Sequence, residues 1–273
     1  MRHIPDRVTD RGLDLLGGAL LVARNEYPNL DEAAVVREID ALGATLALRL
    51  ADRPTAEAQA RELARLLVDE EGFCGDETGY RDARNSYVND VLARRRGIPI
   101  TLSVVWVEVA RRAGIAASSV PFHGYFLVRL DGPKPGSRVL VDPCSHGRVV
   151  TDSTLVRLRA ASTGASIVPD ERELAPADGR VVVVRLLLNL RSLHAARGDY
   201  SRLLVVLDRL VDLLPGSPEQ LRDRGLVTAR MGAPLAARAD LEEYVRLAPR
   251  ADDVDHVRRV IARLAERDDA PAS

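Results

Sequence analysis

The sequence predicts an α+β protein whose mixed N-terminal domain is followed by an all-helical C-terminal domain. Apolar residues recur at helical spacing over residues 1–70 and again beyond residue 181. Between these regions, residues 120–130 and 138–141 are rich in β-branched and aromatic residues, and the segment that joins them is rich in proline and glycine. A length of 273 residues suits one or two domains.

Residues 1–70 are expected to form a helical lead-in. An apolar stripe runs through residues 13–22 and is weakened by two glycines. Asp31 is a good N-cap for a helix over 32–50, because its carboxylate can accept a free N–H of the first turn. A third helix is expected to begin at Thr55, directly after a proline.

A buried central helix is expected over residues 101–113, where nearly every inner turn is apolar. A loop over 71–84 and a shorter helix over 86–96, capped by Ser86, precede it, and Gly97 ends that shorter helix. Thr101 and Ser103 stand at the start of the central helix. We interpret them as caps, because a hydroxyl there stays inert without an adjacent base.

Strands follow the central helix, over residues 120–130 and 138–141, with a third short strand over 148–150. In a continuous first strand, alternation would place His123 and Tyr125 on one face. Together these two side chains could transfer protons. A half-exposed strand histidine without such a role is the alternative that we favour.

A run of reactive side chains follows the second strand, in the order Asp142, Cys144 and His146. Neighbours in sequence often diverge in space, so the run does not by itself predict a catalytic array. A closed zinc site needs four ligands, and Cys74 is the only other thiol. We therefore expect no metal and no cofactor.

The C-terminal region repeats with a period of about 34 residues, which is the period of the tetratricopeptide repeat, a helix–turn–helix unit. Gly198 and Gly232 are one such period apart, and Pro215 and Pro249 have the same separation. In the second unit, Gly225 is small at the point where paired helices approach. A helical bundle with coincidental breaks is the alternative.

The predicted domains are a core domain, a linker and a repeat region. Residues 165–180 are polar and interrupted by prolines and a glycine, which is typical of a linker. The boundaries that we expect are 1–165 for the first domain (lead-in 1–70, core 71–165), 166–180 for the linker and 181–268 for the repeats.

Charge and composition exclude several function classes. The 39 basic and 40 acidic side chains leave a net charge of −1, which excludes a strongly basic nucleic-acid binder and a polybasic membrane anchor. The N-terminus has no signal-peptide pattern, and no apolar run approaches the ~20 residues that span a bilayer. Two cysteines make no disulfide framework, so we expect a reduced, cytoplasmic protein.

The stretch 85–103, which reads NSYVNDVLARRRGIPITLS, resembles the SirB-type family of bacterial proteins. Phe126-Leu127-Val128-Arg129 and Asp142-Pro143 follow in the order expected of that family, and segments near Gly225 and Tyr244 resemble its C-terminal part. The resemblance implies a papain/transglutaminase-like N-terminal domain followed by tetratricopeptide-like repeats.

The resemblance also implies the positions of a catalytic triad. The cysteine of active transglutaminase-like enzymes falls near Thr101, the histidine on Tyr125 and the aspartate on Asp142. Thr101 and Tyr125 supply neither a thiolate nor a base at neutral pH. We therefore expect a catalytically degenerate, non-enzymatic interaction or regulatory module that holds a protein or peptide partner on its repeats. The alternative is a cysteine-dependent hydrolase or acyltransferase that uses Cys144 or Cys74 with His123 or His146.

Overall fold

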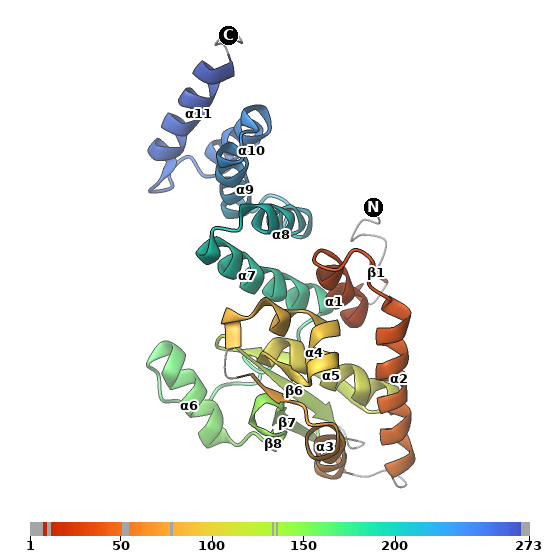
Figure 1. Cartoon of the computed structure of the whole chain (residues 1–273). Coiled ribbons are helices and arrows are strands. Elements are labelled where there is room, and N and C mark those ends of the chain that lie inside the picture. The colour runs from red at the N-terminus through yellow and green to blue at the C-terminus, as the bar shows by residue number, and fades with distance from the viewer. Residues whose placement is uncertain are drawn as a thin grey trace. The chain divides into compact units, whose positions relative to one another are not determined.

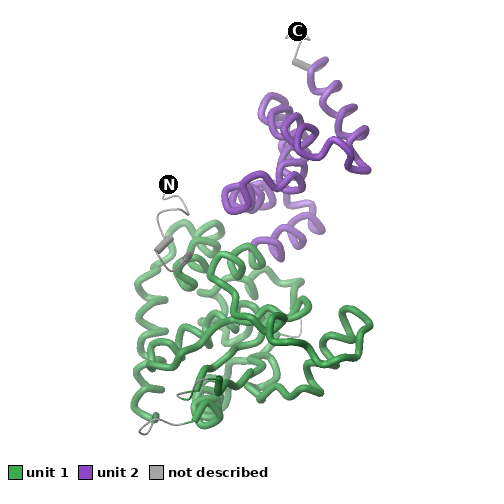
Figure 2. Tube along the Cα trace, turned by 180° about the vertical axis from the view of Figure 1, so that it is seen from behind, with its two compact units in different colours: residues 1–186 green, residues 187–273 purple. Residues whose placement is uncertain are grey.

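The computed structural model describes residues 8–9, 12–50, 55–76, 79–132, 134 and 136–268. The chain divides into two compact units, Met1–Leu186 and Leu187–Ser273, which are coloured separately in Figure 2. The division falls inside one helix, so each unit contains part of that helix. Among the described helices, none is both long and apolar enough to cross a membrane.

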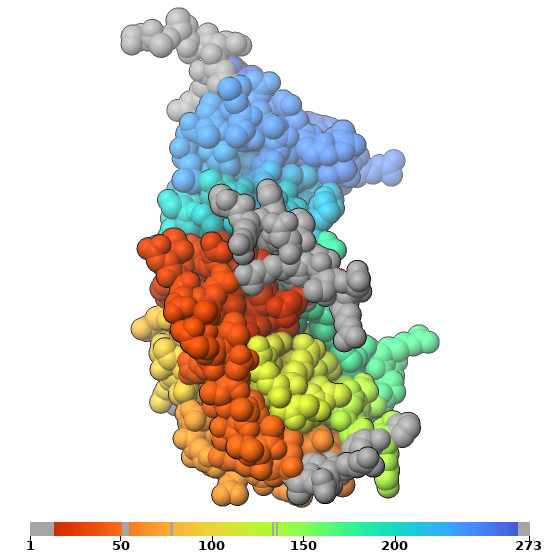
Figure 3. All heavy atoms as spheres, turned by 90° about the vertical axis from the view of Figure 1, so that its right-hand side faces the viewer, coloured from red at the N-terminus to blue at the C-terminus, as the bar shows by residue number. Residues whose placement is uncertain are grey.

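The first unit begins with two short strands, which the sequence does not predict, and the helices of the expected lead-in follow them. A short hairpin of β1 (Val8–Thr9) and β2 (Gly12–Leu13) precedes the helices α1 (Leu15–Arg24), α2 (Glu32–Arg49) and α3 (Ala56–Ala64), and α3 continues into a π-helical turn, η2 (Arg65–Glu70). Asp31 caps α2 by accepting the N–H of Ala34 at 3.0 Å, as predicted. Thr55 likewise caps α3. Helix α2 lies on the surface of this unit (Figure 3).

The central helix α5 (Pro99–Arg112) is buried along nearly its whole length, and Trp106 is fully enclosed. This confirms the buried helix that the apolar inner turns predict. The preceding helix is shorter than predicted, because α4 covers only Val88–Arg94. The cap assigned to Ser86 is wrong: this residue ends a short 3-10 turn, and Tyr87 takes the N-cap position without a side-chain bond.

A four-stranded antiparallel sheet follows in the order β5-β6-β7-β8. Its strands are β5 (Ala116–Phe122), β6 (Tyr125–Asp131), β7 (Arg138–Asp142) and β8 (Arg148–Val149). Helix α5 packs on one face, where Ser103 and Ser119 hydrogen-bond at 3.2 Å (Figure 1). On the other face Val120 and Leu127 belong to an apolar cluster that includes Leu155.

The single strand predicted over 120–130 is wrong. The chain reverses at His123 and Gly124, so that Phe122 pairs with Tyr125. Both turn residues have positive φ, 46° and 83°, as the two-residue turns that connect twisted strands require. His123 therefore lies in a turn and does not share a strand face with Tyr125.

The segment after the sheet packs onto the first unit. Helix α6 (Asp152–Thr163) contributes Leu155 to the apolar cluster, and Leu174 joins the same cluster from the segment predicted as a linker. In addition, Ala177 N–H donates to the carbonyl of Ser119 at 2.8 Å. The domain boundaries stay a prediction, but this part of 166–180 is attached to the sheet.

The second unit is entirely helical in its described residues. Helix α7 (Gly179–Arg197) enters it, followed by α8 (Tyr200–Leu213), α9 (Pro218–Arg230), α10 (Pro234–Leu247) and α11 (Val254–Asp268). A Cβ on Gly225 would lie 2.7 Å from Leu241 Cγ and 3.1 Å from the Ala237 carbonyl. Gly225 is therefore small because α9 and α10 approach closely, as the repeat pattern predicts.

Candidate functional site

The candidate site centres on Asp142, which ends β7 and is only 7% exposed. Its carboxylate caps the 3-10 turn η5 (Pro143–Ser145) by accepting the N–H groups of Cys144 and Ser145 at 2.9 and 3.2 Å. The Ser145 hydroxyl donates to its second oxygen at 2.7 Å. The reactive side chains that follow β7 in sequence therefore lie in a compact turn, which is held by the hydrogen bonds of the Asp142 carboxylate.

Tyr125 completes the set of donors around this carboxylate. Val128 pairs with Val141 in the antiparallel ladder, so Tyr125 at the start of β6 lies diagonally across from Asp142. A tyrosine is long enough to span this diagonal, and its hydroxyl donates to Asp142 Oδ1 at 3.0 Å. Burial and the nearby Asp142 carboxylate raise the pKa of the Tyr125 phenol, so the phenol stays protonated.

The Cys144 thiol adjoins the same cluster. Its Sγ would lie 3.3 Å from a Cβ placed on Gly75, so the thiol packs against strand β3 (Cys74–Gly75), which pairs with β4 (Arg96–Gly97). Burial and the negative charge of Asp142 raise the pKa of Cys144 to about 12, while a hydrogen bond with Tyr125 lowers it. At neutral pH this thiol therefore stays protonated, which disfavours nucleophilic attack by it.

Thr101 does not cap the central helix, contrary to the prediction. The N-cap is Ile98, and Thr101 is fully buried in the first turn of α5. Among the described residues, the Thr101 hydroxyl has no hydrogen-bond partner, so it joins neither Tyr125 nor Asp142. Ser103 is no cap either, because its hydroxyl donates to the carbonyl of Ile100 at 2.8 Å.

The two histidines considered as bases lie in other surroundings. His123 Nε2 lies 3.0 Å from a carboxylate oxygen of Glu173, which also accepts from Arg159. His146 is exposed and has a left-handed backbone at φ 56°. Across the part of the chain that the structure describes, neither histidine hydrogen-bonds a thiol, and no group of three or more His, Cys, Asp or Glu could hold a metal ion.

The arrangement can hold a carboxylate firmly, and in the described residues no histidine hydrogen-bonds a thiol or a hydroxyl of this cluster. Asp142 is surrounded by donors, Tyr125 keeps its proton, and Cys144 keeps its own. Covalent catalysis needs a nucleophile beside a base that can remove its proton. Thr101, Tyr125 and Asp142 do not supply that pair in this geometry.

A comparison with known proteins shows the family of this chain. A model described as "Transglutaminase-like superfamily" matches residues 33–188, and a "Tetratricopeptide repeat" model matches residues 190–262. The chain is a SirB-type member of the transglutaminase-like superfamily. The fold class and the family that the sequence predicts are therefore confirmed.

Curated relatives of this SirB-type chain cover most of its length. A UPF0162 protein of Xylella fastidiosa is 38% identical over 92% of this chain and 90% of its own length. A UPF0162 protein of Pseudomonas aeruginosa is 32% identical over the same shares. Protein SirB1 of Salmonella typhimurium is 26% identical over 77% of this chain and 78% of its own length.

Sequence reasoning missed two neighbours of the site in this SirB-type chain. Ser145 is not among the site residues predicted from the sequence, although an aspartate followed three residues later by serine is a familiar turn pattern. Tyr80 was not selected either; its pKa is raised by burial and by the nearby Cys144. No sequence signal links Tyr80 to Cys144, because they come near each other only when the loop containing β3 folds against η5.

Proposed function

We propose that this SirB-type chain is a catalytically degenerate transglutaminase-like protein that acts as a protein-interaction or regulatory module. One observation carries the proposal. Thr101, near which the cysteine position falls, has a buried hydroxyl with no hydrogen-bond partner among the described residues, while Tyr125 at the histidine position donates a hydrogen bond to Asp142. A phenol that keeps its own proton is too weak a base to take a proton from a nucleophile.

The core domain then has a scaffolding role. Asp142 accepts hydrogen bonds from β6 and from its own turn, which fixes the end of the sheet. The partner is a protein or peptide held on the helical repeats, because stacked repeats present extended surfaces. We place the protein in the cytoplasm, with neither a nucleic acid nor a membrane as its partner.

The alternative of a cysteine-dependent hydrolase has less support. It would need a histidine beside Cys144 or Cys74. In the described residues, His123 bonds with Glu173, and the groups that set the pKa of Cys144 include no histidine. Its elevated thiol pKa also opposes nucleophilic attack.

An aminolysis assay tests the degenerate site. The full chain is incubated with a glutamine-containing peptide and hydroxylamine, and hydroxamate is measured alongside the Asp142→Asn variant. We expect both proteins to give the same background signal. Hydroxamate formation by the natural chain that disappears in Asp142→Asn would refute catalytic degeneracy.

A capture experiment tests the interaction role. The full chain and a chain ending after residue 198, which keeps α7, are immobilised in equal amounts and exposed to a bacterial lysate. We expect a specific protein to bind the full chain and to be lost with the helices α8–α11. Equal capture by both chains would contradict recognition on the repeats.

A further inference from the structure

A cleft lies between helices α9 and α11, within the second unit. Its volume is about 750 Å³, which falls in the range of ordinary ligand sites. The apolar part of its lining is Leu226, Ala229, Val260 and Leu264. Three of these residues are only partly buried, so the cleft keeps apolar surface open to solvent.

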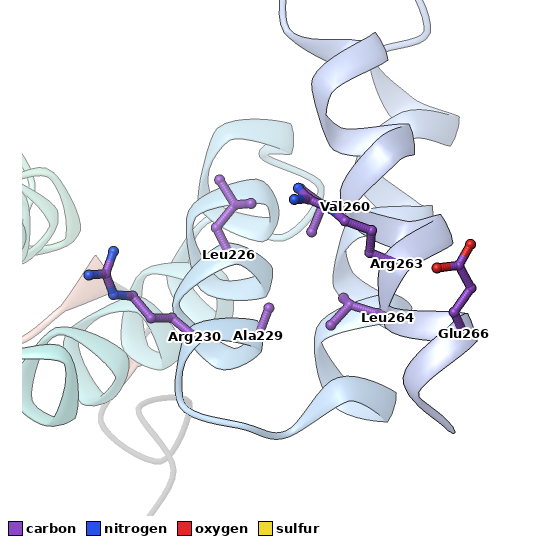
Figure 4. Close-up of a pocket in the computed structure, with 7 residues that line it drawn as sticks. All are labelled: Leu226, Ala229, Arg230, Val260, Arg263, Leu264 and Glu266. Carbon is purple, nitrogen blue, oxygen red and sulfur yellow. The ribbon is translucent and has the colours of Figure 1, made fainter. Parts of the chain in front are cut away.

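The polar part of the lining is predominantly basic. Arg230, Arg263 and Glu266 complete it, and the two arginines are exposed. Figure 4 shows Arg263 directed from α11 toward α9, whereas Arg230 points away from α11. Arg230 stacks over the ring of Tyr200 at 4.6 Å.

Arg263 differs from two arginines of α9, each of which forms an ion pair with an aspartate. Arg224 on α9 bonds to Asp240 at 2.6 Å, and Arg222 bonds to Asp253 at 2.9 Å. Within the described part of the chain, no carboxylate forms an ion pair with Arg263. The cleft therefore combines an open apolar floor with an unmatched cation.

We propose that this cleft binds an acidic amphipathic segment of a partner protein, with an apolar side chain on the floor and a carboxylate on Arg263. The inference rests on the proposed interaction function and specifies its partner. Charge complementarity supports the acidic class. A nucleic acid fits less well, because phosphate binding relies on several cations and this cleft has an apolar floor and an acid.

Fluorescence anisotropy with the full chain tests this site. The probe is a labelled peptide of about 12 residues with leucines at i, i+4 and i+7 and glutamates elsewhere. We expect saturable binding that weakens as salt is added, and at least about tenfold weaker binding by Arg263→Glu. Because Arg263 is exposed, the variant should fold, and its circular dichroism melting curve checks this.

Matched controls separate the site from general charge. Arg250→Glu makes the same charge change at an exposed residue outside the cleft, and it should bind the peptide as the natural chain does. A peptide with lysine in place of each glutamate should not bind. Unchanged binding by Arg263→Glu, equal binding of the lysine peptide, or tighter binding of an oligouridylate would each overturn the inference.

The outcomes also distinguish this inference from the function on which it rests. Capture of a specific protein that Arg263→Glu does not affect would refute the cleft and leave the interaction function standing. Hydroxamate formation that depends on Asp142 would refute the degenerate site and would not concern the cleft.

Discussion

At the scale of single residues, surroundings determine what each reactive side chain can do. Asp142 and Tyr125 were identified from sequence by their order in the family motif, and the structure joins them at 3.0 Å. The prediction that His123 lies in a strand was wrong, because the apolar run over residues 120–130 contains a two-residue hairpin turn. Gly124 is the sequence feature that indicates this turn, because the two turn residues, His123 and Gly124, both need positive φ angles.

The raised pKa of Cys144 predicts slow alkylation. A pKa of about 12 leaves little thiolate at pH 8, so iodoacetamide should modify Cys144 at least about tenfold more slowly in the folded chain than in urea. The folded rate should rise with pH, because each step toward the pKa increases the thiolate fraction. Peptide mass spectrometry measures both rates.

Two variants test the cause of that pKa. Asp142→Asn removes the negative charge that raises the Cys144 pKa, so alkylation should become faster. Tyr125→Phe removes the hydrogen bond that lowers the Cys144 pKa, so alkylation of this variant should be slower than alkylation of the natural chain. The reverse order of rates would show that another group controls the thiol.

At the scale of elements, helices with end signals were predicted well and irregular connections poorly. Asp31 caps its helix as expected, and Thr55 caps the helix that was expected to begin there, because N-capping is a local property of the sequence. Leu174 was assigned to a linker, because its neighbours are polar and its partners on the sheet are far away in sequence. Attachment of this kind depends on tertiary packing.

Leu174→Ala should destabilise the first unit. Leu174 is 5% exposed in the cluster with Val120 and Leu155, so we expect the free energy of unfolding to fall by about 2–4 kcal/mol. Urea denaturation measures this loss. Ile167→Ala, at a residue 59% exposed in the same segment, should change stability by less than about 0.5 kcal/mol. Equal effects would mean that the segment is not attached through Leu174.

Gly225→Ala should destabilise the second unit. The new Cβ would lie 2.7 Å from Leu241 Cγ, and this overpacking costs about 1–3 kcal/mol. Alanine regains up to about 1 kcal/mol over glycine in a helix, so we expect a net loss only where overpacking costs more than about 1 kcal/mol, as the close approach to Leu241 and to the Ala237 carbonyl indicates. Thermal unfolding measures it. In a Leu241→Ala background the loss should shrink, and an unchanged loss would contradict this origin.

At the scale of the whole molecule, the tetratricopeptide period and a family motif were enough to predict two kinds of architecture in one chain. The 34-residue sequence period corresponds to a regular helical arrangement, because each repeat packs mainly against its neighbours in the chain. The division between the compact units was not predictable, because α7 is one continuous helix that the apolar pattern treats as a single element. Its first half belongs to the first unit.

A chain that ends at residue 180 should therefore be much less stable than one that ends at residue 198. The shorter chain lacks Val182, Val183 and Leu186, which are at most 1% exposed. Each buried aliphatic side chain contributes about 1.5–3 kcal/mol, so the loss amounts to several kcal/mol. Urea denaturation of both purified chains measures it. Equal midpoints would contradict the assignment of this half-helix to the first unit.

The burial of Cys144 between Gly75 and Asp142 also bears on oxidation. Peroxides attack thiolates, and a cysteine that keeps its proton resists conversion to sulfenic acid. We therefore expect the thiol in the turn that carries Asp142 to be oxidised slowly by peroxide, so that its sulfur remains a small apolar group.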